Sequence, residues 1–233
     1  MHKRRFNLLE LTIVVVIILV LAALLLPSLY KTKDKARLVI CQGNLKQILT
    51  AGNLYLKDND LGFPSKGKGC IIDYKVWAGK AGVESSWLSG DRFLNTYLGF
   101  EGTATNKTTA LQVTECPSDT GTHGGIYPRP KGVYDTLGTS YFYNSGANSN
   151  SNSKGLYKRK LSDVISPSSM IYANDLSFNA FGGGFNPFHT AYWHDRDING
   201  YGTIGFIDGH VGLRNSTLQT YLRGDDWTFV YYD

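Results

Sequence analysis

An uninterrupted apolar run lies near the beginning of the chain. No residue from Leu11 to Leu26 is charged, and the wider stretch 6–26 would measure about 31 Å as a helix, which matches a bilayer core. A cleavable secretory signal would instead end in small residues of an A-x-A pattern. This run ends at Leu26-Pro27 and continues as helical sequence. The pattern therefore predicts a membrane-spanning helix over 6–26.

A second pattern follows the apolar run. Pro27 has no backbone N–H and is expected to bend the helix rather than end it. Beyond it, apolar residues recur at alternating steps of three and four, which is typical of one helix face packed on a globular head. This amphipathic half of the helix is predicted over 27–58. The stripe consists of Leu38, Cys41, Leu45, Ile48, Gly52 and Tyr55.

The remaining stretch, 59–233, has short apolar runs separated by Gly, Pro, Asn and Ser, which favours loops and strands. We expect a short helix within 85–100, a strand over 111–119 and a buried strand over 169–175. At 190–215, the runs "GTIGFI" and "HVGLR" flank Asp208-Gly209, a dipeptide typical of tight hairpin turns. The fold class is therefore α+β, with a long N-terminal helix packed on a small antiparallel sheet.

Basic residues gather at both ends of the apolar run and account for much of the net charge of +5. Such flanking clusters are typical of contact with lipid headgroups, and no base-reading motif accompanies them, which argues against nucleic-acid binding. Because both flanks are basic, charge alone does not fix the orientation in a membrane. The two clusters are Lys3, Arg4 and Arg5 on one side, and Lys31, Lys33, Lys35 and Arg37 on the other.

One carboxylate, Glu10, stands at the leading edge of the apolar run. An acid costs about 2.5–3.5 kcal/mol at the centre of a membrane helix and less near the interface, so Glu10 could simply reach the interface. The alternative is a cation from another chain. A cut just before Phe6 would create an α-amino group one helical turn from Glu10, and pairing between staggered copies would fix their axial register.

These residues resemble a known family. The stretch "RRFNLLELTIVVVIILVLAALLLP" is similar to the type III signal of type IV pilins and type II secretion pseudopilins. The resemblance implies a leader at 1–5, cleavage between Arg5 and Phe6 by a prepilin peptidase, and N-methylation of Phe6. It also implies assembly through Glu10 and the Pro27-bent helix. The family usually has Gly before the cut, where this chain has Arg5.

The hairpin region carries a second resemblance. It is similar to the C-terminal signature of prepilin-type processing-associated domains, in which a histidine is followed by nine residues and then Asp-Gly. In this chain, the histidine of the signature corresponds to His194, and its Asp-Gly corresponds to Asp208-Gly209, which is followed by His210. Here thirteen residues intervene, so the turn between them is expected to be longer.

Cysteine and acidic residues leave several alternatives open. Cys70 and Cys116 both lie in the predicted head, which favours a disulfide between them, although three buried thiols would also fit. Asp195, Asp197 and Asp208 are weak candidates for a Ca²⁺ site, because the closing Glu of an EF-hand loop is absent. We expect no metal and no other cofactor, and a hairpin whose Asp satisfies its own turn.

The function expected from the resemblance is that of a structural subunit, a pilin or pseudopilin, and not an enzyme. Its partners would be the bacterial inner membrane, a prepilin peptidase and copies of itself or related pilins. The leader would be cytoplasmic, the head extracytoplasmic, and the filament periplasmic or extracellular. The sequence leaves pilus and secretion pseudopilus open. The alternatives are a membrane-tethered extracytoplasmic protein that binds carbohydrate or another surface, and a tethered hydrolase, for which no catalytic motif is found.

Overall fold

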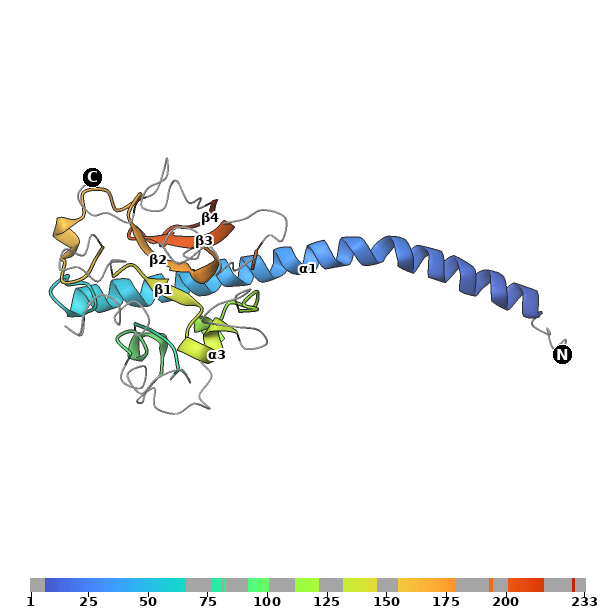
Figure 1. The fold of residues 1–233 in the computed structure, drawn as a ribbon, viewed down its shortest axis with the longest axis horizontal. Coiled ribbons are helices and arrows are strands. Elements are labelled where there is room, and N and C mark those ends of the chain that lie inside the picture. The colour runs from blue at the N-terminus through green and yellow to red at the C-terminus, as the bar shows by residue number, and fades with distance from the viewer. Residues whose placement is uncertain are drawn as a thin grey trace, which may run out of the picture.

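The computed structural model describes residues 7–65, 77–80, 82, 92–100, 112–121, 132–145, 155–178, 193–194, 201–215 and 228. Its dominant element is one helix, α1 (Leu8–Asp58), which passes through Pro27 without a break. Figure 1 shows that the N-terminal half of α1 projects from the head as a gently bent rod, while the C-terminal half runs through the head. The prediction of a continuous helix ending at Asp58 is therefore confirmed.

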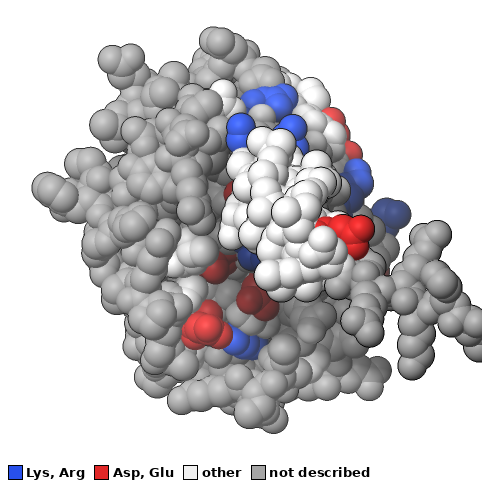
Figure 2. Space-filling model, turned by 90° about the vertical axis from the view of Figure 1, so that its right-hand side faces the viewer, with Lys and Arg blue, Asp and Glu red and all other residues white. Residues whose placement is uncertain are grey.

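The projecting half of α1 has no packing partner within this chain. Every residue from Asn7 to Ala36 is exposed. The most apolar window of α1 has a mean hydropathy of 3.1, and among the described residues α1 is the helix long and apolar enough to cross a membrane. In Figure 2 the rod is seen end-on as an almost entirely white column with Lys and Arg side chains beside its base. Length and composition thus allow this half to span a bilayer.

The head contains a four-stranded sheet in the order β1-β2-β3-β4, with every neighbouring pair antiparallel. Figure 1 shows β3 and β4 on one side of α1 and the short helix α3 on the other. Strands β2, β3 and β4 lie where the sequence predicts strands, whereas β1 is not predicted. The bounds are β1 (Tyr141–Tyr143), β2 (Ile171–Asp175), β3 (Tyr201–Phe206), β4 (Val211–Asn215) and α3 (Val133–Leu137).

Glycines allow close contact between the sheet and α1. A Cβ added at Gly205 of β3 would come within 2.4 Å of Leu49 Cδ1 on α1. The pairing of β2 with β3 is irregular around Tyr172, and a Cβ added at Gly52 of α1 would lie 2.7 Å from Tyr172 Oη. The predicted stripe forms much of this interface. The buried residues of α1 are Cys41, Leu45, Ile48, Leu49, Ala51, Gly52 and Leu56.

This close approach gives a testable pair of substitutions. Gly205→Ala should lower the free energy of unfolding by about 1–3 kcal/mol, because the added methyl group must displace Leu49 from a packed core. Gly43→Ala is the matched control: a Cβ at this position of α1 meets nothing within 4 Å, so helix propensity should raise stability by about 0.5–1 kcal/mol. Urea unfolding followed by tryptophan fluorescence would measure both. Equal effects of the two substitutions would contradict this packing.

Two expectations for the head differ from the structure. The predicted strand at 111–119 is wrong for its described part, which contains the 3₁₀ turn η3 (Gln112–Thr114). The hydrogen bonds of this segment are made with groups outside the sheet. Asn44 Nδ2 donates to Glu115 O at 2.8 Å, and Ser140 N donates to Thr114 O at 2.9 Å.

The predicted helix within 85–100 is also shorter than expected in its described part. In the part that the structure describes, 92–100, it contains only the 3₁₀ turn η2 (Thr96–Leu98), which ends at Gly99 with φ +76°. Asn95 Nδ2 donates to the backbone oxygen of Gly79 at 2.8 Å, so its side chain bonds a distant loop. A further 3₁₀ turn, η4 (Leu161–Asp163), precedes β2.

The β3–β4 hairpin is confirmed, but its turn is longer than a two-residue turn. Gly209 N donates to Phe206 O at 2.9 Å, and Phe206 N donates to His210 O at 2.9 Å. Of the Asp208-Gly209 dipeptide, only Gly209 has a positive φ, +89°. The turn therefore contains one residue in the left-handed region, Gly209, followed by a bulge, which explains why glycine is needed there. Asp208 does not need a positive φ, and its side chain accepts a hydrogen bond within the turn.

Candidate functional site

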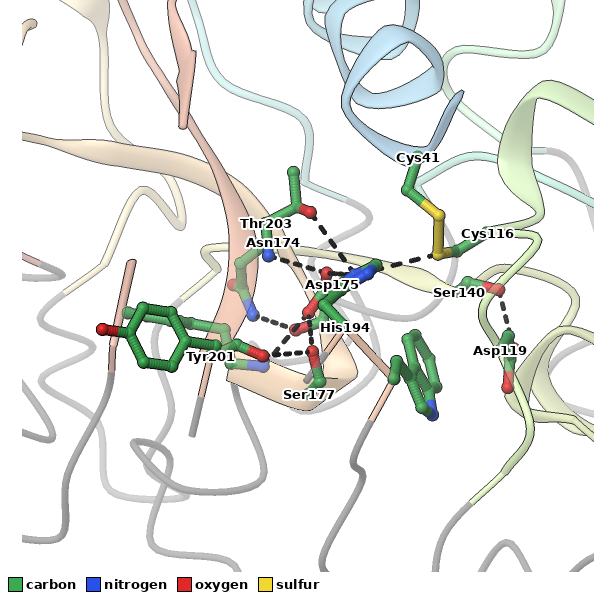
Figure 3. A network of polar contacts seen from close by, with 12 residues as sticks. Cys41, Cys116, Asp119, Ser140, Asn174, Asp175, Ser177, His194, Tyr201 and Thr203 are labelled. Atoms are coloured by element: carbon green, nitrogen blue, oxygen red, sulfur yellow. Dashed lines mark hydrogen bonds and ion pairs between the residues drawn. A yellow bond between two sulfur atoms is a disulfide. The ribbon is translucent and has the colours of Figure 1, made fainter. Parts of the chain in front are cut away.

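A buried contact between an aspartate and a histidine lies where β2 ends. Asp175 Oδ2 is 2.7 Å from His194 Nε2, and both side chains are fully buried. Three further groups donate to the same carboxylate: Ser177 Oγ to Oδ1 at 2.7 Å, Phe178 N to Oδ1 at 3.1 Å and Thr203 N to Oδ2 at 2.7 Å. Figure 3 shows Ser177, His194 and Thr203 gathered around Asp175. Both carboxylate oxygens are therefore satisfied by the fold.

These contacts set the charge of Asp175. Burial alone would raise the pKa of Asp175, but the adjacent His194 and the hydrogen bonds from Ser177 and Thr203 outweigh it and lower the pKa. The carboxylate is thus ionised at neutral pH. His194 faces it through Nε2, and its Nδ1 is buried without a hydrogen-bond partner among the described residues.

A disulfide adjoins this pair and joins α1 to the head. It links Cys41 with Cys116 across a sequence separation of 75. The expected Cys70–Cys116 pairing is therefore wrong, because Cys116 is already bonded to Cys41, and Cys70 lies outside the described residues. Cys116 Sγ is 3.9 Å from His194 Nε2. Figure 3 shows the disulfide beside the Asp175–His194 pair, so the two form one buried cluster.

This cluster does not have the geometry of a Cys-His-Asp catalytic triad. In such a triad the nucleophile and the carboxylate bond to opposite nitrogens of the imidazole ring, so that the ring can pass a proton between them. Here the same atom, Nε2 of His194, faces both Asp175 and Cys116. The sulfur of Cys116 is also oxidised, and the side chains are buried. The arrangement fastens parts of the fold together.

The β3–β4 turn forms a second attachment to α1. Lys46 Nζ donates to Gly209 O at 2.5 Å. Asp208 Oδ1 accepts from His210 N at 3.0 Å and lies 2.6 Å from His210 Nδ1, so this Asp satisfies its own turn as expected. The His210 ring also stacks on Phe206 with centroids 3.9 Å apart. The turn is thus fixed both internally and to the helix.

The two ends of the predicted C-terminal motif therefore meet the same helix. His194 lies against the disulfide to Cys41, and Gly209 accepts the hydrogen bond from Lys46. We use the name helix–head junction for one set of residues: Cys41, Lys46, Cys116, Asp175, His194 and Gly209. The other predicted ligands, Asp195 and Asp197, lie outside the described residues, so a Ca²⁺ site there stays a prediction.

A separate buried carboxylate supports α3. Asp119 accepts hydrogen bonds from Gly121 N, Val133 N, Tyr134 N and Ser140 Oγ, at distances from 2.7 to 3.0 Å. Burial raises the pKa of Asp119, although these four hydrogen bonds act in the opposite direction. Asp119 thereby holds the beginning of α3 against the loop that follows Cys116, which is a structural role.

The N-terminal candidate residues lie at the far end of α1. Glu10 Oε2 accepts a hydrogen bond from Asn7 N at 3.1 Å, and Asn7 Oδ1 accepts one from Leu9 N at 3.4 Å. Glu10 therefore caps its own helix, a role that the spacing Asn-x-x-Glu could have predicted. Pro27 lies exposed within α1, and Arg5 and Phe6 lie outside the described residues.

The sequence analysis did not predict the role of Asp175 or the pairing of Cys41. Asp175 is the last residue of the predicted strand 169–175, and an acid that ends a buried apolar run is a signal of an internal partner. Cys41 stands in the apolar stripe of α1 and could not be paired from spacing alone. Its partner, Cys116, is far away along the chain.

A long N-terminal helix that projects from a small four-stranded antiparallel sheet is an arrangement consistent with a pilin-like fold. A comparison with curated proteins agrees. Over 64 residues the chain is 38% identical to the type II secretion system core protein G of Pseudomonas aeruginosa. The match covers 28% of this chain and 44% of that protein, so the chain spans less than half the length of this relative. No protein-family profile matches the chain, and no solved structure matches it.

The partial similarity to a type II secretion pseudopilin and the pilin-like arrangement of helix and sheet point in the same direction. The exposed apolar half of α1 fits a membrane-anchored protein.

Proposed function

We propose that this protein is a structural subunit of a filament of the type IV pilus or type II secretion kind. The observation that carries the proposal is the projecting half of α1, which is exposed over its whole length from Asn7 to Ala36. An apolar surface of this length must be covered by lipid or by other chains. In a subunit that passes from the inner membrane into a filament, this surface is covered first by lipid and then by the helices of neighbouring subunits.

We further propose that a prepilin peptidase cuts between Arg5 and Phe6, removing 1–5, and that Phe6 is methylated. Segments 6–26 and 27–58 then form the assembly and head-bound halves of the helix, and 59–233 forms the extracytoplasmic head. The cut would leave the Asn7–Glu10 cap in place, because Asn7 keeps its backbone N–H. Glu10 uses Oε2 in that cap, so Oε1 remains to accept the amine of a neighbouring copy.

Of the two kinds of filament, a type II secretion pseudopilus is the better supported. The curated relative is by name a core protein of a type II secretion system. The chain shares only part of its length with that relative, so the head is expected to determine which neighbours the subunit meets.

The test combines the mature N-terminus with assembly in the producing cell. Mass spectrometry of the wild-type protein should give a chain that begins at methylated Phe6, and sheared filaments should contain it. Glu10→Gln should be cut in the same way but fail to enter filaments, because the neutral amide cannot neutralise the amine of a neighbour. Asp34→Asn is the matched control, since Asp34 is an exposed acid on the same helix whose partner is Arg37 at 3.7 Å.

Asp34→Asn should leave both cleavage and filament yield unchanged. A wild-type chain that retains Met1 would count against the proposal. Filaments of Glu10→Gln at wild-type yield would show that Glu10 has no role in assembly.

A further inference from the structure

The helix–head junction brings three potential metal donors together and places a carboxylate beside one of them. Cys41 Sγ, Cys116 Sγ and a ring nitrogen of His194 lie within 4.8 Å of one another. Asp175 Oδ2 lies 2.7 Å from His194 Nε2. Cys41 and Cys116 are 0% and 1% exposed, and the side chains of His194 and Asp175 are fully buried. The set offers two sulfurs, one nitrogen and one oxygen, which is a donor set that Zn²⁺ accepts.

One separation, between Cys116 Sγ and His194 Nε2, is close to that of a tetrahedral zinc site, whereas the two bonded sulfurs must move to about 3.8 Å apart after reduction. With Zn–S bonds of about 2.3 Å and Zn–N bonds of about 2.0 Å, a thiolate sulfur and an imidazole nitrogen stand about 3.6 Å apart. The Cys116 Sγ to His194 Nε2 distance is 3.9 Å. Nitrogen and carboxylate oxygen would need about 3.4 Å in the same geometry, so the 2.7 Å contact between His194 and Asp175 must open slightly.

The disulfide decides whether the sulfurs are available. As long as Cys41 and Cys116 are bonded to each other, neither sulfur is a thiolate and no zinc can bind. A dithiol reductant supplies two electrons and two protons: the S–S bond breaks, two thiols form, and the reductant becomes a disulfide. Zn²⁺ then displaces the two thiol protons to solvent and forms two Zn–S bonds, and it binds His194 Nε2 as the proton on that nitrogen moves to Nδ1.

We propose that the reduced helix–head junction is a structural zinc site, with Cys41, Cys116 and His194 as ligands and Asp175 as the fourth. Zinc and the disulfide are then alternative links between α1 and the head. Because all four ligands are buried in the folded head, the metal is taken up as the reduced chain folds, and its binding energy contributes to folding. Later oxidation by a protein disulfide would form the Cys41–Cys116 bond and release the zinc, while that disulfide accepts two electrons, takes two protons from solvent and becomes a dithiol.

The experiment compares two states of the full chain in detergent micelles. One sample is unfolded, reduced with a dithiol, refolded with an equimolar amount of Zn²⁺ and desalted; the other is treated identically without reductant. Elemental analysis should find about one zinc per reduced chain and none in the oxidised chain. With Co²⁺ in place of Zn²⁺, the reduced chain should show a sulfur-to-cobalt charge-transfer band, which the oxidised chain lacks.

Two cysteine variants locate the site. Cys70→Ser leaves the proposed ligands untouched and should keep the bound zinc, whereas Cys41→Ser combined with Cys116→Ser should lose it. If the double variant does not fold, the comparison of oxidised and reduced wild-type protein still tests whether zinc binding requires the free thiols, because it needs no substitution.

Three results would overturn the proposal. They are a reduced chain that refolds in the presence of Zn²⁺ with no zinc bound, equal zinc in the oxidised and reduced chains, and loss of zinc in Cys70→Ser. None of these measurements depends on filament assembly, so their outcome is independent of the proposed function.

Discussion

Replacing Cys41 and Cys116 together by alanine should lower the free energy of unfolding of the head by about 4 kcal/mol. The disulfide closes a loop with a sequence separation of 75, and a cross-link across such a loop restricts the unfolded chain by about this amount. It also ties α1 to the rest of the head, which would otherwise be held by packing and hydrogen bonds such as that from Lys46. Urea unfolding of the detergent-solubilised chain, followed by tryptophan fluorescence, would measure the loss.

The measurement should be made with a metal chelator present, so that zinc cannot replace the lost link. Reduction of the wild-type chain under the same conditions should produce a similar loss. Cys70→Ala is the matched control and should leave the unfolding midpoint nearly unchanged. If Cys70→Ala destabilised the head as much as the double variant, Cys70 would be the cysteine that matters for stability.

Asp175→Asn should destabilise the head by about 2–4 kcal/mol, because hydrogen bonds to a buried carboxylate are lost and a buried donor is left without an acceptor. The substitution preserves the shape of the side chain. It replaces one carboxylate oxygen by an amide N–H₂, which cannot accept the hydrogen bonds that Thr203 N and His194 Nε2 direct at Oδ2 or, in the other orientation, that of Ser177 Oγ at Oδ1. Thermal or urea unfolding would measure the change.

The same residue predicts how stability depends on pH. The fold lowers the pKa of Asp175 below its usual value of about 3.9, so folding favours the ionised form. The stabilisation is complete above the unfolded pKa and is lost as the pH falls through the lowered folded pKa. The gap in stability between wild type and Asp175→Asn should therefore be widest at neutral pH and narrow below about pH 4.

Asp135→Asn is the matched control for both measurements. Asp135 pairs with Lys80 at 2.8 Å, but its side chain is 58% exposed. Its loss should change stability by less than about 1 kcal/mol. An equal effect of Asp135→Asn and Asp175→Asn would show that burial of the His194 pair does not carry the stabilisation.

The parts of the fold that sequence reasoning found are those that local periodicity determines. The helix to Asp58 follows from an apolar run and an apolar stripe, each of which is visible within a few turns. The β3–β4 hairpin follows from two β-rich runs around Asp208-Gly209. In both cases the interacting residues are close neighbours in the chain.

The parts that it missed depend on contacts between distant segments. The partner of Cys116 is Cys41 because α1 runs through the head, and this course cannot be deduced from a helical pattern. The segment around Thr114 has strand-like residues, yet its hydrogen bonds go to Asn44 and Ser140 from other elements. Asp175 likewise becomes important only because the fold places His194 beside it.

The position of the disulfide on α1 has a mechanical consequence. Cys41 is the first buried residue of α1 after its long exposed half, so a pull on that half reaches the head at Cys41 before it reaches the packed stripe beyond. Tension along the rod is thus passed to the head by a covalent bond, and the weaker contacts of β3 with Leu45 and Leu49 are shielded from shear.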